Sequence, residues 1–243
     1  MVTNISWTRM IRKLLLVFFL TPALAFGQLF EEDEGYTKEF IWGVSKNTNS
    51  GLIGGLVMKW SKSIGNDFYR TIGFEIMNVK HPKEQRYISP STGTAFIFGK
   101  ENFLYAIRGQ YGIEKVMYKK APQQGVQIHF AAAAGPTMGI VAPYIVVSSG
   151  ESEKYDPTVH TTPSAIQGSG RLFEGLCFGH IVPGANAKAS TIFEFGTFRK
   201  SVAGVEIGVM AEAYAQTIIL VPTQRNRAVF TSAFFTLFWG SRK

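Results

Sequence analysis

The residues best suited to chemistry in this chain are its four histidines and its single cysteine. His160 lies in the segment YDPTVHTTPS near Asp156 and Ser164, and His180 follows Cys177 by three residues. A histidine beside a hydroxyl or a thiol could act as the general base for a nucleophile in acyl transfer. Neither neighbourhood matches a catalytic signature. Loops rich in Ser, Thr and Pro also bring such residues together by chance. We therefore expect no catalytic residue in this chain.

Metal and cofactor sites are equally unsupported by the sequence. His129, in VQIHFAAAAG, has no Ser or acidic residue near it, and the histidines and the cysteine are too scattered to form a metal-ligand cluster of recognised spacing. The glycine-rich segment GLIGG at 51–55 lacks the lysine and the following helix of a phosphate-binding loop. We expect neither a metal nor a cofactor.

Other charged residues recur on one face of segments in which apolar and polar side chains alternate. In 205–221 the odd positions are mostly apolar, whereas Glu206 and Glu212 occupy even positions. The segment 103–113 places Phe, Tyr and Ile residues on one face and Arg108 on the other. Alternation with a period of two predicts β-strands. These segments exceed the mean strand of about 5–6 residues and reach the roughly 9–11 residues with which a strand crosses a bilayer.

About eight such strands are predicted, which together with the alternation indicates an all-β, transmembrane, antiparallel up-and-down β-barrel. Pro136 and Pro143 require a bulge or a bend in the strand predicted at 126–147. The remaining strands are predicted at 39–47, 52–63, 68–79, 191–199 and 228–243. Alternation alone also fits a soluble sandwich or a lipocalin-like barrel, in which the apolar faces would point inward. Strand length, aromatic strand ends and the single cysteine favour the membrane barrel.

The polar faces of an eight-stranded barrel meet in an interior that side chains can fill. We expect a filled lumen, in which Arg108 and Lys59 neutralise carboxylates through charge-assisted hydrogen bonds. His129 falls on the same face. The predicted network consists of Lys59, Glu75, Arg108, Glu114, Glu194, Glu206 and Glu212. A narrow conduit through the lumen is the alternative.

The N-terminal segment 1–27 is typical of a signal peptide. Basic residues precede a short apolar run at 14–20, and small residues allow cleavage after Ala25 or Gly27. The apolar run is shorter than the ~20 residues of a transmembrane helix. We expect the rest of the chain to divide into a periplasmic segment and a barrel, at 28–35 and 36–243. Short turns would lie on the periplasmic side, and long extracellular loops are predicted at 80–102 and 148–186.

The stretch FGKENFLYAIRGQYGIEKVMYKKAPQQGVQIHFAAAAGPTMGIVAPYIV at 98–146 resembles a family of small exported barrel proteins of the Bacteroidota outer membrane. The segments KYDP at 154–157 and FEFGTF at 193–198 and the aromatic final strand are similar too. This chain has APQQG at 121–125 where the family usually has an aromatic YWGG turn. The resemblance implies a non-enzymatic barrel that is an accessory subunit of the machinery that inserts or exports outer-membrane proteins.

These observations predict an outer-membrane protein that acts as a structural or accessory subunit of an envelope complex, without catalysis. Its expected partners are outer-membrane lipid, lipopolysaccharide and other envelope proteins. The formal net charge is +8, but the charges are dispersed and form no basic stripe, so we expect no nucleic-acid partner. The alternatives are an enzyme that modifies lipid A through a histidine-based site at the outer rim, and a narrow channel.

The aromatic C-terminal segment 228–243 predicts the closing strand of the barrel. It would pair with 39–47, so that neither strand has a free edge. Its odd positions would face lipid and its even positions the lumen, with Arg242 and Lys243 beyond the membrane in water. The lipid-facing residues of this predicted insertion signal are Phe235, Leu237 and Trp239.

Deletion of residues 233–243 should abolish membrane assembly, because the barrel would lose its closing strand. Membrane fractionation of cells that produce the shortened chain measures the effect. A shortened chain that still inserted would contradict the assignment of the closing strand.

Overall fold

The computed structural model describes residues 36–119, 125–171, 174–195 and 201–243, without the side chains of 51–53. The predicted signal peptide, the segment 28–35 and most of the segment APQQG at 121–125 lie outside the described residues. None of the helices in the part of the chain that the structure describes is long and apolar enough to cross a membrane.

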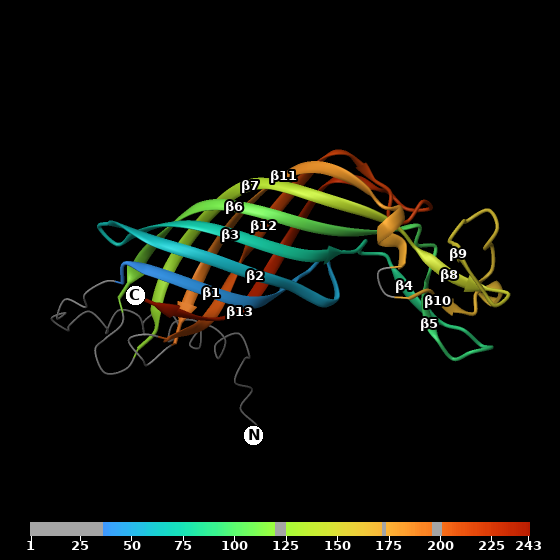
Figure 1. Ribbon diagram of the computed structural model, residues 1–243, viewed down its shortest axis with the longest axis horizontal. Helices are drawn as coiled ribbons and strands as arrows, with labels where there is room; N and C mark the ends of the chain where they lie inside the picture. Colours follow the sequence, from blue (N-terminus) through green and yellow to red (C-terminus); the bar gives the residue numbers. More distant parts are fainter. Residues whose placement is uncertain (1–35, 120–124, 172–173, 196–200) are drawn as a thin grey trace, which may run out of the picture. The chain divides into compact units, whose positions relative to one another are not determined.

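The described chain forms a closed ring of eight antiparallel strands in the order β1-β13-β12-β11-β7-β6-β3-β2 (Figure 1). Ring strands that follow one another along the chain are neighbours in the ring, which confirms the predicted up-and-down topology. The ring strands are β1 (Lys38–Asn47), β2 (Ser50–Gly65), β3 (Phe68–Val79), β6 (Asn102–Tyr118), β7 (Gln127–Pro143), β11 (His180–Glu194), β12 (Ser201–Ile218) and β13 (Arg227–Arg242).

Strand β13 closes the ring by pairing with β12 on one side and β1 on the other. The pairing with β1 runs from Glu39 opposite Arg242 to Asn47 opposite Phe234. The side chains of β13 alternate as predicted: Phe235, Leu237 and Trp239 are exposed on the outside, and Phe234, Thr236 and Phe238 are buried inside. The barrel therefore has a terminal end, where β1 begins and β13 ends, and an opposite loop end.

The two long connections at the loop end fold into small sheets of their own (Figure 1). Residues 80–101 contain the hairpin of β4 (Gln85–Ile88) and β5 (Ala95–Phe98). Residues 144–179 contain β8 (Ile145–Ser148), β9 (Glu151–Lys154), β10 (Gly168–Ser169) and the 3-10 turns η2 (Pro163–Ala165) and η3 (Glu174–Phe178). We call these two connections together, residues 80–101 and the described part of 144–179, the rim platform. Its buried core consists of Phe96, Tyr144, Val146, Tyr155 and Ile166.

Strand β11 begins earlier than predicted, so the loop expected to run to residue 186 ends at residue 179. Residues 180–186 pair with β7, from His180 opposite Val141 onward. Pro183 is tolerated because pairing with β12 begins only at Gly184. The hydrogen bond to β12 that a proline cannot donate is therefore not needed at this position.

A bulge or a bend was predicted at the two prolines of β7; Pro136 causes no register shift, and Pro143 is the last residue of the strand. The register between β6 and β7 is the same on both sides of Pro136, and pairing lapses opposite it at Gly109 and Gln110. Gly135 lets the two backbones approach, because a Cβ there would lie 2.3 Å from the Gly109 carbonyl oxygen. The register of this pair shifts between Val116 and Tyr118 instead. A further irregularity lies in β12, where the register to β13 shifts between Ala213 and Ile218. The alternation predicted through residue 221 therefore breaks, and Val221 is buried.

Gly240 lies at the seam between β1 and β13, and a Cβ there would lie 2.1 Å from the Phe40 carbonyl oxygen. Gly240→Val should lower the free energy of unfolding by roughly 1–3 kcal/mol, because the seam cannot widen without losing hydrogen bonds. Urea unfolding of the reconstituted barrel measures the loss. Thr231→Val, on the outer face of the same strand, is the control and should unfold like the parent. Equal stability of the two variants would contradict the tight seam.

Candidate functional site

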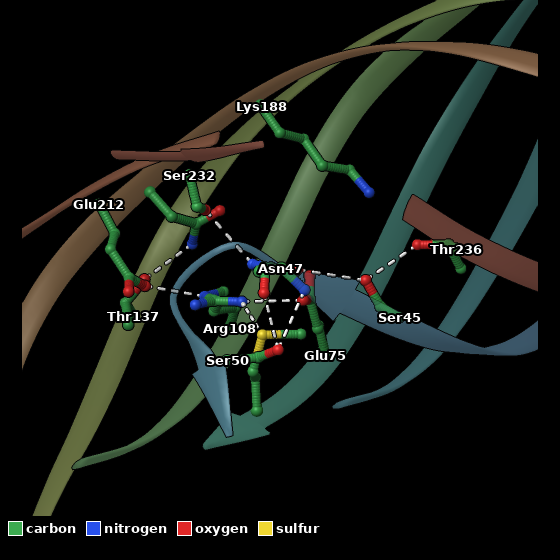
Figure 2. A network of polar contacts seen from close by, with 12 residues as sticks. Ser45, Asn47, Ser50, Glu75, Arg108, Thr137, Lys188, Glu212, Ser232 and Thr236 are labelled. Carbon is green, nitrogen blue, oxygen red and sulfur yellow. Dashed lines mark hydrogen bonds and ion pairs between the residues drawn. The ribbon is translucent and has the colours of Figure 1, made fainter. Parts of the chain in front are cut away.

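The centre of the lumen holds an arginine between two carboxylates that come from different sides of the ring. Arg108 of β6 is 1% exposed. Its Nη1 lies 2.8 Å from an oxygen of Glu75 on β3, and its Nε lies 2.8 Å from an oxygen of Glu212 on β12 (Figure 2). Because β6 and β12 are separated in the ring by β7 and β11, the ion pair with Glu212 spans the interior. This cluster ties distant strands together and fills the lumen.

Neutral polar side chains form hydrogen bonds around the central cluster. The amide of Asn186 donates to the Thr137 hydroxyl at 2.9 Å and accepts from Gln110 at 3.2 Å. On the opposite wall, the Thr236 hydroxyl donates to Ser45 at 2.9 Å (Figure 2). These bonds satisfy buried polar groups that would otherwise be costly. They also connect the closing strand to β1 through the interior.

A second set of charges lies toward the terminal end. Lys59 Nζ lies 2.7 Å from one oxygen of Glu114, and the other oxygen of that carboxylate contacts His129 Nδ1. His129 Nε2 lies 3.6 Å from Glu194. Arg242 Nε lies 2.8 Å from Glu39, and an Nη of Arg242 contacts Glu194. Charges of opposite sign therefore alternate across this part of the lumen.

Lys188 and Glu206 form a further ion pair on the wall made by β11 and β12. Lys188 Nζ lies 3.2 Å from Glu206, whose carboxylate also accepts a hydrogen bond of 2.6 Å from Ser190. The structure thus places every residue of the predicted network inside the barrel. Three residues outside the predicted network take part in these ion pairs: Lys188 pairs with Glu206, and Arg242 pairs with Glu39 and Glu194.

Each missed residue had a signal in the sequence. Glu39 and Arg242 occupy lumen-facing positions if the alternation of β1 and β13 is extended to the strand ends. Arg242 was predicted in water, but its side chain is only 12% exposed because Glu39 and Glu194 draw it inward. Lys188 lies before residue 191, where the predicted strand began, although its even position places it on the same inward face as Ser190 and Glu194.

The loop end of the lumen is closed by apolar side chains rather than by ion pairs. Ile218 and Leu220 turn inward after the irregularity in β12. They pack with buried residues of five other ring strands or their connections. The resulting apolar plug consists of Val79, Leu104, Ala106, Val141, Val182, Tyr214, Ile218, Leu220, Val221 and Phe230.

The histidines are held by groups other than nucleophiles. His160 is buried in the rim platform, where its Nδ1 accepts the Asp156 backbone N–H at 3.1 Å and its Nε2 lies 3.0 Å from the Glu153 carboxylate. His180 lies 3.5 Å from the Gln216 amide. Among the described residues, no histidine has a hydrogen bond with a Ser, Thr or Cys side chain, and no cluster of His, Cys, Asp or Glu could hold a metal ion.

Two pockets lie at the loop end. One of about 690 Å³ is lined by side chains that include Glu84, Tyr87, Tyr155 and His160. The other, of about 320 Å³, has Lys83, Arg225 and Arg227 in its lining. Buried Lys100 lies 2.8 Å from Glu84. Burial lowers the pKa of the Lys100 ammonium, and the neighbouring Glu84 carboxylate opposes that shift.

Arg108→Met should lower the free energy of unfolding by about 3–5 kcal/mol, because it leaves two buried carboxylates without a cation. Urea unfolding in detergent measures the loss. The combined variant Glu75→Gln/Arg108→Met/Glu212→Gln should recover much of it, since none of the three charges of this cluster remains. Arg70→Met, which removes an exposed cation from β3, is the control. An Arg108→Met barrel as stable as this control would show that the cluster does not stabilise the fold.

No protein-family model matches the chain, and no curated protein matches it in sequence. Among solved structures, the chain is similar to Neisserial surface protein A (NspA), with 12% identity and a TM-score of 0.35, over 87% of this chain and 98% of that one. It is also similar to Ail, the attachment invasion locus protein of Yersinia pestis, with 10% identity and a TM-score of 0.37, over 85% of this chain and 97% of that one. Ail in complex with the heparin analogue sucrose octasulfate gives 12% identity and a TM-score of 0.36. The eight-stranded barrel is established by the strand pairing of this chain itself.

Proposed function

We propose that this protein is an integral outer-membrane β-barrel that serves as a structural or accessory subunit of an envelope complex, without catalysis. A role beside the machinery that assembles or exports outer-membrane proteins is the finer form of the proposal, and it rests on the family resemblance of the sequence. The observation that carries the proposal is an ordered rim platform with exposed apolar side chains, which stands on a barrel whose own interior is filled.

The outer face of the ring supports placement in a membrane. Large apolar side chains from every ring strand point away from the lumen, and Leu56, Ile72 and Val209 are 57–62% exposed. Soluble monomers rarely expose contiguous apolar patches larger than a few hundred Å². A soluble barrel with its apolar faces inward would have the reverse arrangement, so lipid is the environment that suits this surface.

Aromatic rings near the terminal end support the same placement. Trp42 of β1 and Trp239 of β13 lie with their ring centroids 5.6 Å apart, and Phe40 and Trp60 lie 5.1 Å apart. Rings of this kind form girdles where a transmembrane barrel meets the membrane surface. The terminal end would then face the periplasm and the loop end the exterior.

The filled interior supports a role that needs no conduction. Ion pairs occupy the centre and the terminal end of the lumen, and the apolar plug closes the loop end. An ion would have to displace both to pass. The surroundings of the histidines likewise favour a structural role over acyl transfer, because the candidate bases of the described chain lack a nucleophile to activate.

The rim platform supplies the surface for a partner. It has its own apolar core, so its shape does not depend on a ligand. Ile88 and Phe178 are 69% and 76% exposed on it. Tyr87 and Val159 of the platform are exposed as well. We place the proposed contact with another envelope protein on the platform because several large apolar side chains are exposed there.

Crosslinking in whole cells, combined with membrane fractionation, tests this proposal. The parent should be recovered in the outer membrane and should crosslink to a partner. Ile88→Ser/Phe178→Ser should fractionate like the parent but lose most of the crosslinked product, because both side chains are exposed and neither supports the fold. Ile64→Ser, an exposed apolar residue near the terminal end, is the matched control. A parent found only as a free monomer, or outside the outer membrane, would contradict the proposal.

A further inference from the structure

The smaller pocket at the loop end has the composition of an anion site. We call it the rim pocket. It lies where the turn between β1 and β2, the connection that follows β3, and the connection between β12 and β13 meet. Its lining is Asn49, His81, Pro82, Lys83, Ile218, Leu220, Arg225, Arg227, Val229, Phe230 and Thr231. We propose that the rim pocket binds the phosphate group of a phosphorylated lipid of the outer leaflet. This inference rests on the proposed placement of the barrel in the outer membrane.

The charges of the rim pocket are not neutralised within the described part of the chain. Lys83, Arg225 and Arg227 form none of its ion pairs, and no acidic residue contributes to the pocket lining. Glu84 follows Lys83 in the sequence, but its carboxylate pairs with Lys100 at 2.8 Å. The lumen cations, by contrast, each face a carboxylate. An anion from outside the chain would therefore complete the charge balance of the pocket.

Hydrogen bonds hold the backbone that carries the cations. His81 Nδ1 accepts the Lys83 N–H at 3.2 Å, so its Nε2, 3.4 Å from the Arg225 carbonyl oxygen, is the nitrogen that donates. This contact joins the connection after β3 to that between β12 and β13. It brings Lys83 and the two arginines to one pocket from segments far apart in the sequence.

Asn226 fixes the turn that carries the arginines. Its side-chain oxygen accepts the Leu220 N–H at 2.9 Å, and its amide donates to the Val221 carbonyl at 3.0 Å. Arg225 and Arg227 flank this anchored residue, so the backbone that presents them is ordered before any ligand binds. Arginine binds phosphate oxygens through two parallel N–H bonds, so it is better suited to this task than a freely moving charge.

The wall beside the arginines suits an acyl chain, which favours a lipid over a free phosphate. Val229, two residues after Arg227, lines the pocket and is 52% exposed on the outer face of β13. It pairs with Ala213 of β12, and Ala211 pairs with Thr231 in the next outward position. These short side chains continue from the pocket down the apolar exterior. A headgroup phosphate on the arginines would place its acyl chain against this strip.

Native mass spectrometry of the purified, refolded full-length protein tests the inference. The probe is lipid A in micelles of a neutral detergent, in bis-phosphorylated form and after removal of the phosphates. The parent should retain the phosphorylated form at least tenfold more strongly. Arg225→Ala/Arg227→Ala should lose at least tenfold in affinity for it, because each arginine supplies charged hydrogen bonds. Arg225→Lys/Arg227→Lys should keep part of the affinity.

Lys62→Ala/Arg70→Ala is the matched control, because it removes two exposed cations that lie opposite each other near the terminal end. It should bind lipid A like the parent. Equal binding by the Arg225→Ala/Arg227→Ala variant and the parent would overturn the inference, as would indifference to the lipid phosphates. Displacement by millimolar inorganic phosphate alone would show a free-anion site and overturn the assignment to lipid. Fractionation decides the membrane placement separately, so failure of the pocket and failure of the proposed function give different results.

Discussion

Closure of the sheet between β1 and β13 is the constraint on which the rest of the structure depends. Once the ring closes, the polar face of every strand is enclosed in an interior that holds side chains and little else. A charge placed there without a partner would be very costly. The ion pairs of Arg108, Lys59 and Arg242 follow from this condition, since each cation is paired with at least one carboxylate from another strand. Closure and charge pairing therefore depend on each other: the ring creates the interior, and the pairs hold its walls together.

The two ends of the lumen satisfy this condition differently. Toward the terminal end, Glu39, Glu114 and Glu194 face Lys59, His129 and Arg242, so acidic and basic groups are matched. At the loop end the irregularity in β12 turns Ile218 and Leu220 inward, and the interior becomes apolar. A wall of paired charges resists shear between strands because the pairs cross the lumen. An apolar plug excludes water without needing such matching. Together they fill the lumen from the terminal end to the loop end.

The alternation of side chains was enough to predict the barrel, its closing strand and most of the charges that point inward. That information is local, since period two is visible in any long strand. Three features were beyond its reach. The start of β11 contains Pro183, a residue unfavourable inside a sheet, which is accommodated there because β12 does not pair with it. The inward turn of Ile218 depends on a register shift that involves a second strand. The rim platform and the rim pocket join segments far apart in the sequence, and no periodicity records such contacts.

The basic residues discussed above fall into two groups, those that form an ion pair with a carboxylate of the chain and those that do not. Inside the barrel an unpaired charge would be costly to bury, so Arg108, Lys188 and Arg242 all form ion pairs. At the rim, water can solvate a cation, so the cation can remain unpaired and available for a ligand. Lys100 follows the same rule as the lumen cations, because it is buried in the loops and forms an ion pair with Glu84. Arg225 and Arg227 differ because they are exposed yet held on an ordered turn by Asn226. Order without neutralisation is what distinguishes a binding site from a solvated charge, and in the described chain this combination occurs where the apolar wall meets the rim.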